Sequence, residues 1–267
     1  MSATTETGDG AGPEIGSALA AEAAAIFGGA LPQAERYAAL LTGAGAERGI
    51  VGPAEATRIW DRHLLNCGVI GRLIPAACSV VDLGSGAGLP GIVLAMLRPE
   101  CQVTLLEPMA RRASFLQECV GALGLTNVEV VRGRAEEFAG KLSADVVTAR
   151  AVAPLEKLAA LAAGLARPGG RVLAMKGAAA AAELARARPV LARLGIGDAR
   201  VVTVASASGA ITATLVAFTT SSSRSVGSPP TAGRRAQPHG PEAVRGGRGP
   251  AGSGRRQSRP NSRRGGG

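Results

Sequence analysis

The segment VVDLGSGAGLPG, residues 80–91, places four glycines directly after a short run of β-branched and apolar residues. Glycine loses more conformational freedom on folding than any other residue, so this density weakens regular structure. A chain keeps such glycines where the backbone must turn tightly or where another group comes very close to it. The segment therefore predicts a strand that ends near Leu83 and a loop that leads into a helix beginning at Leu89-Pro90.

The chain after residue 79 alternates between short strand-like runs and longer helical runs. The predicted strands are residues 79–83, 101–107, 127–131, 144–149, 170–176, 199–206 and 213–219. Helical runs at 90–97, 110–123, 154–166 and 178–194 separate most of them, and 132–138 reads as a loop. This alternation predicts an α/β fold of Rossmann-like type, a mostly parallel seven-stranded sheet with helices on both faces. Because only a few residues join the last two strands, they should form an antiparallel hairpin at one edge.

Four regions are predicted along the chain. Residues 15–75 carry apolar side chains at three- and four-residue spacing and are expected to form a helical cap, interrupted by a loop at 43–52. Pro53 is a candidate first residue of its third helix, which should end near Gly71. Residues 76–219 form the α/β domain, and residues 1–14 and 220–267 are expected to be disordered.

The positive charge of the chain is concentrated in the C-terminal region. The formal net charge is +10, and residues 219–267 contribute +9 of it through ten arginines and one acid, which leaves +1 for residues 1–218. This region is mostly Gly, Pro, Ser and Arg, so it cannot bury a core. It is either an arm that contacts RNA or DNA phosphates nonspecifically or a solvated extension, and composition does not decide between them.

Other patterns limit the class of protein. The polar, acidic N-terminus does not resemble a secretory signal, and no stretch of about 18 large apolar residues indicates a membrane span. The four cysteines (67, 78, 101 and 119) lack metal-site spacing and are expected to be reduced, packed thiols. We expect a cytoplasmic protein with no metal.

Two cofactors compete for the glycine loop. A dinucleotide site needs Gly-x-Gly-x-x-Gly at the strand end, but counting from Gly84 puts Leu89 at the sixth position. Counting from Gly86 fits only two residues late, with Pro90 inside the motif. The pattern acid-x-Gly-x-Gly-x-Gly, formed by Asp82, Gly84, Gly86 and Gly88, instead favours S-adenosylmethionine (SAM). A helix N-terminus can meet the carboxylate of SAM, and an acid favours its ammonium and sulfonium charges.

Two further segments complete the predicted cofactor site. Glu107 ends the second strand, 23 residues after Gly84, where a carboxylate can accept both ribose hydroxyls. Ala135 and Glu136 follow the third strand, and their backbone groups are candidates to contact the adenine edge. Without the glycine loop, Glu107 would read as a solvated strand end and 134–137 as an ordinary polar loop.

Five segments in this order resemble the bacterial RsmG/GidB family of SAM-dependent methyltransferases, which modify guanine N7 in small-subunit ribosomal RNA. They are VDLGSGAGLPGIVLA, TLLEPMARRASFLQ, RAEEF, ARAVAPL and LAMKG, and the earlier WDRHLLNC resembles the family's His-Leu-Leu segment. The resemblance covers roughly residues 35–180. Gly-Leu-Pro-Gly after the loop and Arg-Ala after the fourth strand are not general methyltransferase features.

The resemblance implies functional residues by position. SAM contacts fall on Gly84, Leu89, Ala135, Glu136 and Arg150, of which Arg150 is a candidate to hold the methionine end or the incoming RNA. Lys176 falls on the family's Lys-Gly, and His63 on a histidine that packs toward the site, so both join Arg150 as positioning candidates; a lone helical His is otherwise more often a packed residue. The implied partner is 16S ribosomal RNA or the small ribosomal subunit.

The sequence departs from the family pattern at two places in the cap. Asn66-Cys67 replaces the family's Asp-Ser, and AERGIVG replaces an Asn-Leu-Thr-like segment; both changes lie in the cap and bear on its RNA contacts.

Guanine N7 carries a lone pair and no proton, so its methylation needs placement of the two reactants rather than a catalytic base, which suits a chain with no certain catalytic residue. Arginines near strand ends are candidates for backbone contacts (111, 112, 132, 134 and 150). The alternatives are a SAM-dependent methyltransferase of a small molecule or protein, or a nonenzymatic RNA- or nicotinamide-binding protein.

Overall fold

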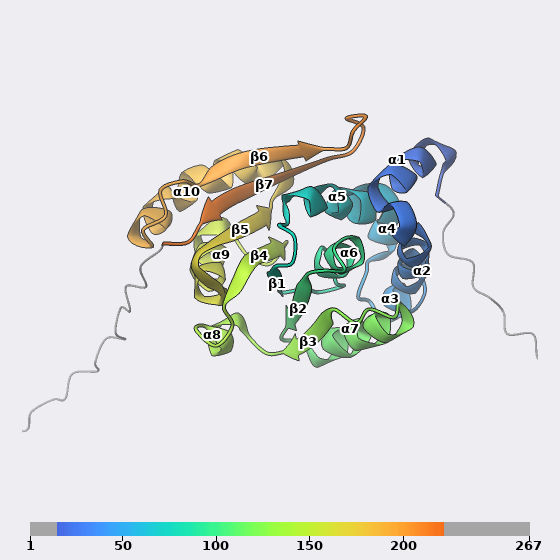
Figure 1. The fold of residues 1–267 in the computed structure, drawn as a ribbon, viewed down its shortest axis with the longest axis horizontal. Coiled ribbons are helices and arrows are strands. Elements are labelled where there is room, and N and C mark those ends of the chain that lie inside the picture. The colour runs from blue at the N-terminus through green and yellow to red at the C-terminus, as the bar shows by residue number, and fades with distance from the viewer. Residues whose placement is uncertain (1–14, 222–267) are drawn as a thin grey trace, which may run out of the picture. The chain divides into compact units, whose positions relative to one another are not determined.

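The computed structural model describes residues 15–221, and its centre is a seven-stranded sheet in the order β3-β2-β1-β4-β5-β7-β6 (Figure 1). The first five strands are parallel, and β7 runs antiparallel to both β5 and β6. The predicted fold class and edge hairpin are therefore confirmed, whereas the predictions for residues 1–14 and 222–267 lie outside the described residues. The strands are β1 Ser79–Leu83, β2 Gln102–Glu107, β3 Val128–Arg132, β4 Ala144–Arg150, β5 Ala166–Met175, β6 Arg200–Ala205 and β7 Thr212–Thr219.

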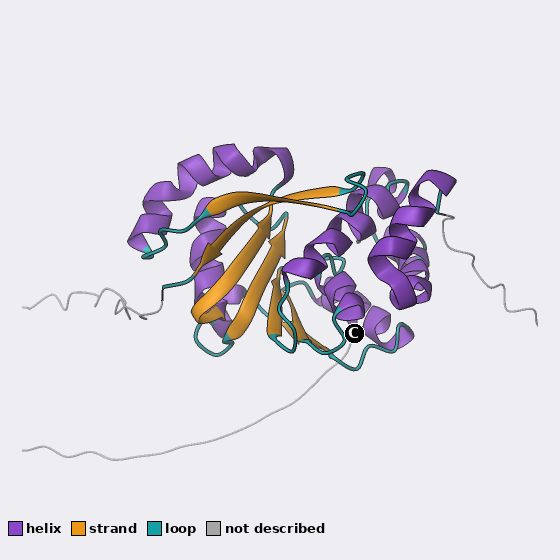
Figure 2. Ribbon diagram, turned by 45° about the horizontal axis from the view of Figure 1, so that its top comes forward, coloured by secondary structure: helices purple, strands orange, loops and turns teal. Residues whose placement is uncertain are grey.

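Helices cover both faces of the sheet (Figures 1 and 2). The α-helices are α1 Ser17–Phe27, α2 Leu31–Thr42, α3 Ala44–Glu47, α4 Pro53–Ala56, α5 Leu65–Gly68, α6 Gly91–Leu97, α7 Ala110–Ala122, α8 Ala135–Phe138, α9 Leu155–Leu165 and α10 Ala180–Arg193. Shorter 3₁₀ turns are η1 Gly28–Ala30, η3 Val69–Leu73 and η4 Gly177–Ala179, and η2 Ile59–Leu64 is a π-helix. Among the described residues, no helix is long and apolar enough to span a membrane.

Strand alternation divides the core into two layers. In β1, Val80 packs with the cap helices, α6 and α7, whereas the next residue, Val81, packs with α9 and α10. The same alternation in β2 sends Leu105 to the first layer and Leu106 to the second. Both faces of these strands are buried, which explains why β1 and β2 read as nearly continuous apolar runs rather than as alternating ones.

The helical cap shares its core with the sheet. The buried side chains of α1, α2 and α5 belong to the same apolar cluster as α6, β1 and β2. Pro53 does begin a helix, as predicted, but the long third cap helix that we expected is broken into α4, the π-helix η2, α5 and η3. Two expected loops also contain short helices, α3 within 43–52 and α8 within 132–138.

The order of the strands reverses at β1. The chain builds β1, β2 and β3 toward one edge of the sheet and then returns to place β4 and β5 on the other side of β1. In open α/β sheets, ligands bind at the carboxyl ends of the strands where the order reverses in this way. The glycine loop follows β1 directly, so the fold positions it at this point.

Candidate functional site

The glycine loop needs backbone conformations that only glycine adopts readily. Gly84, Gly86 and Gly88 have φ values of +66°, +59° and +92°. A Cβ on Gly84 would lie 2.9 Å from Val152 Cγ2, and one on Gly88 would lie 2.6 Å from the hydroxyl oxygen of Tyr37. The turn therefore requires all three glycines, and at Gly84 and Gly88 the side chains packed against the loop also leave no room for a Cβ.

Asp82 lies beneath the loop and is fully buried. One carboxylate oxygen accepts from Thr148 Oγ1 at 2.9 Å, and the other accepts from the backbone N–H of Gly91 at 3.1 Å, the first residue of α6. Burial raises the pKa of Asp82 to about 6, although the hydrogen bonds from Thr148 and Gly91 oppose the shift. Its carboxylate thus fixes the helix that follows the loop and brings a buried acid close to it.

Tyr37 holds the loop from the cap. Its hydroxyl donates to the carbonyl oxygen of Ala87 at 2.5 Å, and its side chain is fully buried. Burial raises the pKa of Tyr37 well above its ordinary value, so the hydroxyl remains a donor. Sequence reasoning missed this residue because no local pattern connects α2 to a loop 50 residues later.

Glu107 ends β2 and faces the loop. It is 1% exposed, and its two oxygens accept from the backbone N–H groups of Gly86 at 2.9 Å and Met109 at 3.0 Å. A carboxylate has about four acceptor positions, so two remain for a ligand. Met109, immediately beyond, is 46% exposed and leaves an apolar side chain beside this acid.

The remaining residues predicted on the cofactor side lie at the loop and after β3. Leu89 packs against the cap-side core and is joined to Pro90 by a cis peptide bond. Ala135 is buried at the start of α8, and Glu136 is exposed beside it. The backbone N–H of Arg134 donates to Glu137 at 3.2 Å, which fixes the first turn of α8.

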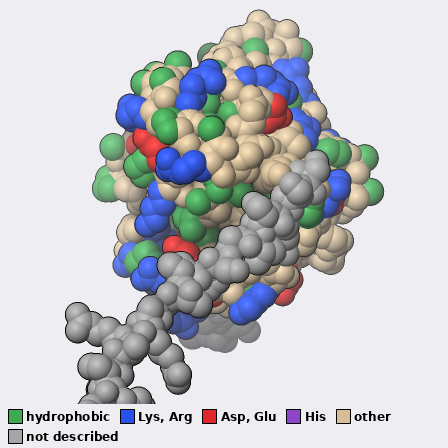
Figure 3. All heavy atoms as spheres, turned by 90° about the vertical axis from the view of Figure 1, so that its left-hand side faces the viewer, with side chains coloured by type: hydrophobic (Ala, Val, Ile, Leu, Met, Phe, Trp, Pro, Cys, Tyr) green, Lys and Arg blue, Asp and Glu red, His purple; other side chains and the backbone are tan. Residues whose placement is uncertain are grey.

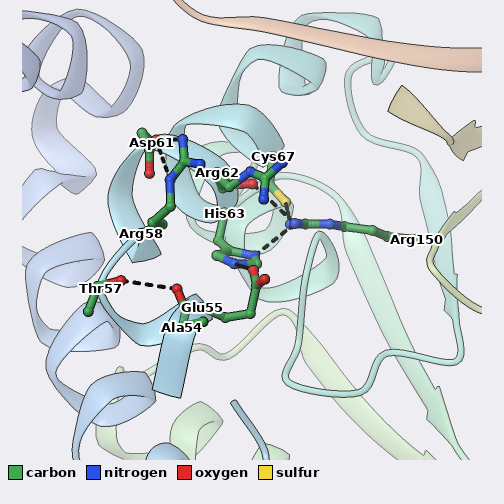
Figure 4. A network of polar contacts seen from close by, with 9 residues as sticks. All are labelled: Ala54, Glu55, Thr57, Arg58, Asp61, Arg62, His63, Cys67 and Arg150. Atoms are coloured by element: carbon green, nitrogen blue, oxygen red, sulfur yellow. Dashed lines mark hydrogen bonds and ion pairs between the residues drawn. The ribbon is translucent and has the colours of Figure 1, made fainter. Parts of the chain in front are cut away.

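Arg150 ends β4 and contacts the cap. Its guanidinium donates to the carbonyl oxygen of Arg62 at 3.1 Å and to Cys67 Sγ at 3.2 Å, and it lies 2.7 Å from His63 Nδ1 (Figure 4). The other ring nitrogen of His63 lies 2.5 Å from Glu55. The structure therefore brings together Arg150 and His63, two of the positioning candidates.

Lys176, the third positioning candidate, clamps the segment after Arg150. Its ammonium pairs with Glu183 at 2.9 Å and donates to the carbonyl oxygen of Ala153 at 2.5 Å. Glu183 in turn accepts from the backbone N–H of Leu155 at 2.9 Å. Because the charge of Lys176 is neutralised by Glu183, the direct role of Lys176 is to hold residues 151–155 in place. Sequence reasoning did not single out Glu183.

A cavity of about 890 Å³ opens between the cap and the ends of β4 and β5. Arg150, Val152 and Lys176 are among the residues that line it, and the glycine-loop residues do not. Charged side chains from the cap and α10 form much of the remainder (Glu55, Arg58, Asp61, Arg62, Glu183 and Arg186).

The candidate site therefore has two adjoining parts. The loop side consists of Gly84–Leu89, Glu107, Ala135 and Glu136 at the ends of β1 to β3. The cavity side begins at Arg150 and Val152, and Val152 packs directly on Gly84. Among the described residues, no group of three or more His, Cys, Asp or Glu side chains is placed to hold a metal ion.

Residues 30–211 match the family model described as GidB, rRNA small subunit methyltransferase G. Relatives named ribosomal RNA small subunit methyltransferase G agree with this match. The protein from Thermobifida fusca is 60% identical over 168 residues, which cover 63% of this chain and 71% of that protein. The protein from Salinispora tropica is 54% identical over 186 residues, which cover 67% of this chain and 77% of that protein.

A solved structure shows a weaker likeness. Precorrin-6y C5,15-methyltransferase from Geobacter metallireducens has a TM-score of 0.43 and 18% identity, over 56% of this chain and 83% of that one.

Proposed function

The chain belongs to the rRNA small subunit methyltransferase G (GidB) family, and from that membership we propose that it transfers a methyl group from SAM to N7 of a guanine in 16S ribosomal RNA. The observation that carries the proposal is the arrangement at the switch point of the sheet. There a glycine loop and Glu107 adjoin, through Val152, a cavity bordered by Arg150.

The loop side fits SAM. Glu107 retains acceptor positions for the ribose hydroxyls, and because it is 1% exposed, ribose binding requires the neighbouring loop to shift. Met109 offers an apolar surface beside the ribose site, and Ala135 and Glu136 offer backbone groups for the adenine edge. Asp82 acts through the position of the loop and α6, and its negative charge favours the cationic methionine end of SAM.

Methylation of guanine N7 requires that SAM and the guanine be correctly placed and does not require proton transfer. Bound SAM supplies a methyl group, which the N7 lone pair of guanine accepts as the carbon–sulfur bond breaks with its electrons on sulfur. No proton leaves N7, so the chain needs no general base. Its residues instead hold the two reactants in line and exclude water, which is where most of the rate enhancement of such a reaction can originate. Arg150 and the segment that Lys176 clamps lie where the two parts of the site meet.

The cavity side suits an RNA nucleotide. Its cations come from the cap (Arg58 and Arg62), from β4 (Arg150) and from α10 (Arg186). Arg58 is paired with Asp61 and Arg186 with Glu156, so Arg62 and Arg150 are the candidates to contact phosphates beside the target base. The outer face that carries α9 and α10 shows separate Lys and Arg side chains rather than one continuous basic patch (Figure 3). We expect this reaction in the cytoplasm, where ribosomal subunits are assembled.

Methyl transfer in vitro tests the proposal. The protein is incubated with SAM and either naked 16S ribosomal RNA or small subunits isolated from cells that lack this gene, and methylated guanines are mapped by mass spectrometry. The expected product is 7-methylguanine at one position. Methylation of metabolites or proteins with unmodified RNA would support the alternative substrate class.

Cofactor titration separates the remaining alternative. Calorimetry should show binding of SAM and of its demethylated product. Binding of NAD without binding of SAM would refute the cofactor assignment and with it the enzymatic proposal.

A further inference from the structure

The cap holds the guanidinium of Arg150 through neutral acceptors. These are the carbonyl oxygen of Arg62, the Nδ1 atom of His63 and the thiol of Cys67 (Figure 4). Burial raises the pKa of the Cys67 thiol, so it remains uncharged. Lys176, in contrast, is paired with the carboxylate of Glu183. Arg150 is thus oriented by its contacts without being neutralised by them.

The local helix geometry creates this arrangement. Residues Ile59–Leu64 form a π-helix, a rare geometry that is enriched at functional sites. This segment and the turn after it present the Arg62 carbonyl, the His63 ring and the Cys67 thiol to the same guanidinium.

The contact between Arg150 and His63 fixes where the imidazole carries its proton. An arginine side chain can only donate hydrogen bonds, so His63 Nδ1 must be the unprotonated acceptor. The proton of the neutral ring then lies on Nε2, which donates it to Glu55 at 2.5 Å. A doubly protonated His63 would have no acceptor for Arg150 and would place a second cation 2.7 Å from it.

We propose that His63, neutral and protonated on Nε2, is the positioning residue for Arg150, and that a second proton on His63 detaches Arg150 from the cap. The inference rests on the proposed function, because it makes the position of Arg150, which lines the same cavity, depend on pH. Arg150 must be in place for the cofactor and the target base to meet, so methyl transfer falls when the His63 ring becomes cationic.

The charged groups around His63 set the direction of the pH dependence. Burial lowers the pKa of His63 below 6.5, and the charge of Arg150 on β4 lowers it further. Glu55 on α4 opposes this shift through its hydrogen bond and charge, and Asp61 in the π-helix opposes it more weakly, since Asp61 is itself paired with Arg58. Arg150 is therefore held at pH values above 6.5 and released as the pH falls through the lowered pKa of His63.

Two amide substitutions of His63 separate positioning from packing. The side-chain oxygen of asparagine in His63→Asn can take the place of Nδ1 and accept from Arg150 at every pH. The longer side chain of His63→Gln reaches the place of Nε2 and retains the contact with Glu55, but it leaves Arg150 without this acceptor. At pH 8 we expect His63→Asn to retain several-fold more methyl transfer than His63→Gln, with similar thermal midpoints for both variants.

The pH profile provides the decisive readout. Asp82, whose pKa is raised to about 6, also titrates at acidic pH, but wild type and variant share this group. The quantity to compare is therefore the ratio of the wild-type rate to the His63→Asn rate from pH 8 down through the pKa of His63, which ¹⁵N NMR of the His63 ring locates. This ratio should fall about tenfold per pH unit below the pKa of His63. A constant ratio, or equal rates for the Gln and Asn variants at pH 8, would overturn the proposal.

Two further measurements complete the test. Glu55→Gln removes the charge that raises the pKa of His63, so it should move the acid limb of the wild-type profile to lower pH; an unmoved limb would contradict the assignment. ¹⁵N NMR of His63 in the full chain reads its protonated nitrogen without any methylation assay. Absence of methylation with an Nε2–H imidazole would therefore count against the proposed function alone, whereas an Nδ1–H imidazole would overturn the positioning role.

Discussion

The ionised carboxylate of Asp82 should lower the free energy of unfolding at neutral pH. Its pKa is 3.8 in an unfolded chain and about 6 in the fold, chiefly because burial disfavours the charged carboxylate. The folded state therefore binds the proton more tightly, and the associated stability is fully present below pH 3.8 and lost as the pH rises through about 6. Because one pKa unit corresponds to about 1.4 kcal/mol, the ionised carboxylate costs on the order of 3 kcal/mol at high pH.

The variant Asp82→Asn removes this cost without removing the hydrogen bonds. The amide oxygen can still accept from the Gly91 N–H, and the amide N–H₂ can donate to Thr148 Oγ1, which is able to rotate and accept. We expect the variant to gain stability relative to wild type as the pH rises, by about 1 kcal/mol between pH 5 and pH 7. At the same time SAM affinity should fall, because the acid near its cationic end is lost.

Urea denaturation of both proteins at pH 5, 6 and 7, with SAM calorimetry at pH 7, measures the two effects. Other titrating groups are common to the two proteins, so the difference in unfolding free energy isolates Asp82. A difference that does not change with pH would show that Asp82 is not buried in its charged form. A variant that binds SAM as tightly as wild type would remove the electrostatic role assigned to this acid.

Three further substitutions test the loop. Gly91→Ala would place a Cβ 2.3 Å from Leu105 Cδ2, so the thermal midpoint should fall with a loss of about 1–3 kcal/mol; an unchanged midpoint would mean that α6 can shift freely. Tyr37→Phe leaves the Ala87 carbonyl without its donor, and calorimetry should show SAM affinity reduced by up to about tenfold. Glu107→Ala should weaken SAM binding by at least about tenfold, and unchanged affinity would exclude the ribose contact.

The sheet, and the positions of the glycine loop and Glu107 at the ends of β1 and β2, could be predicted because their signals are local. A few neighbouring residues are enough to recognise the β-branched runs, the turn at Gly84 and the acid at Glu107. Parallel strands then bring their carboxyl ends together at one edge of the sheet. The broken third cap helix could not be predicted in the same way. Its apolar spacing is helical, whereas the π-helix at Ile59–Leu64 depends on the packing of the cap against the sheet.

The cavity side depended on contacts between distant segments. No residue close to Lys176 in the sequence indicates that its charge is paired with Glu183, and no residue close to Tyr37 indicates a hydrogen bond to Ala87. Arg150 and Lys176 were named through resemblance, and both do line one cavity. Their partners required the fold, because each partner lies on a different element.

The Asn66-Cys67 departure in the cap has a physical consequence that follows from the contacts of these two side chains. The amide nitrogen of Asn66 donates to the carbonyl oxygen of Thr212 at 2.6 Å and so joins α5 to β7. An ionised aspartate at this position has no hydrogen to donate and would face that oxygen with a negative charge. Its neighbour Cys67 meets Arg150 through a buried thiol, where a serine hydroxyl would be a stronger acceptor. In this chain Asn66 therefore attaches the cap to the edge hairpin, and Cys67 gives Arg150 a weaker acceptor than a serine hydroxyl would. The position of the guanidinium should consequently depend more on His63 than it would beside a serine.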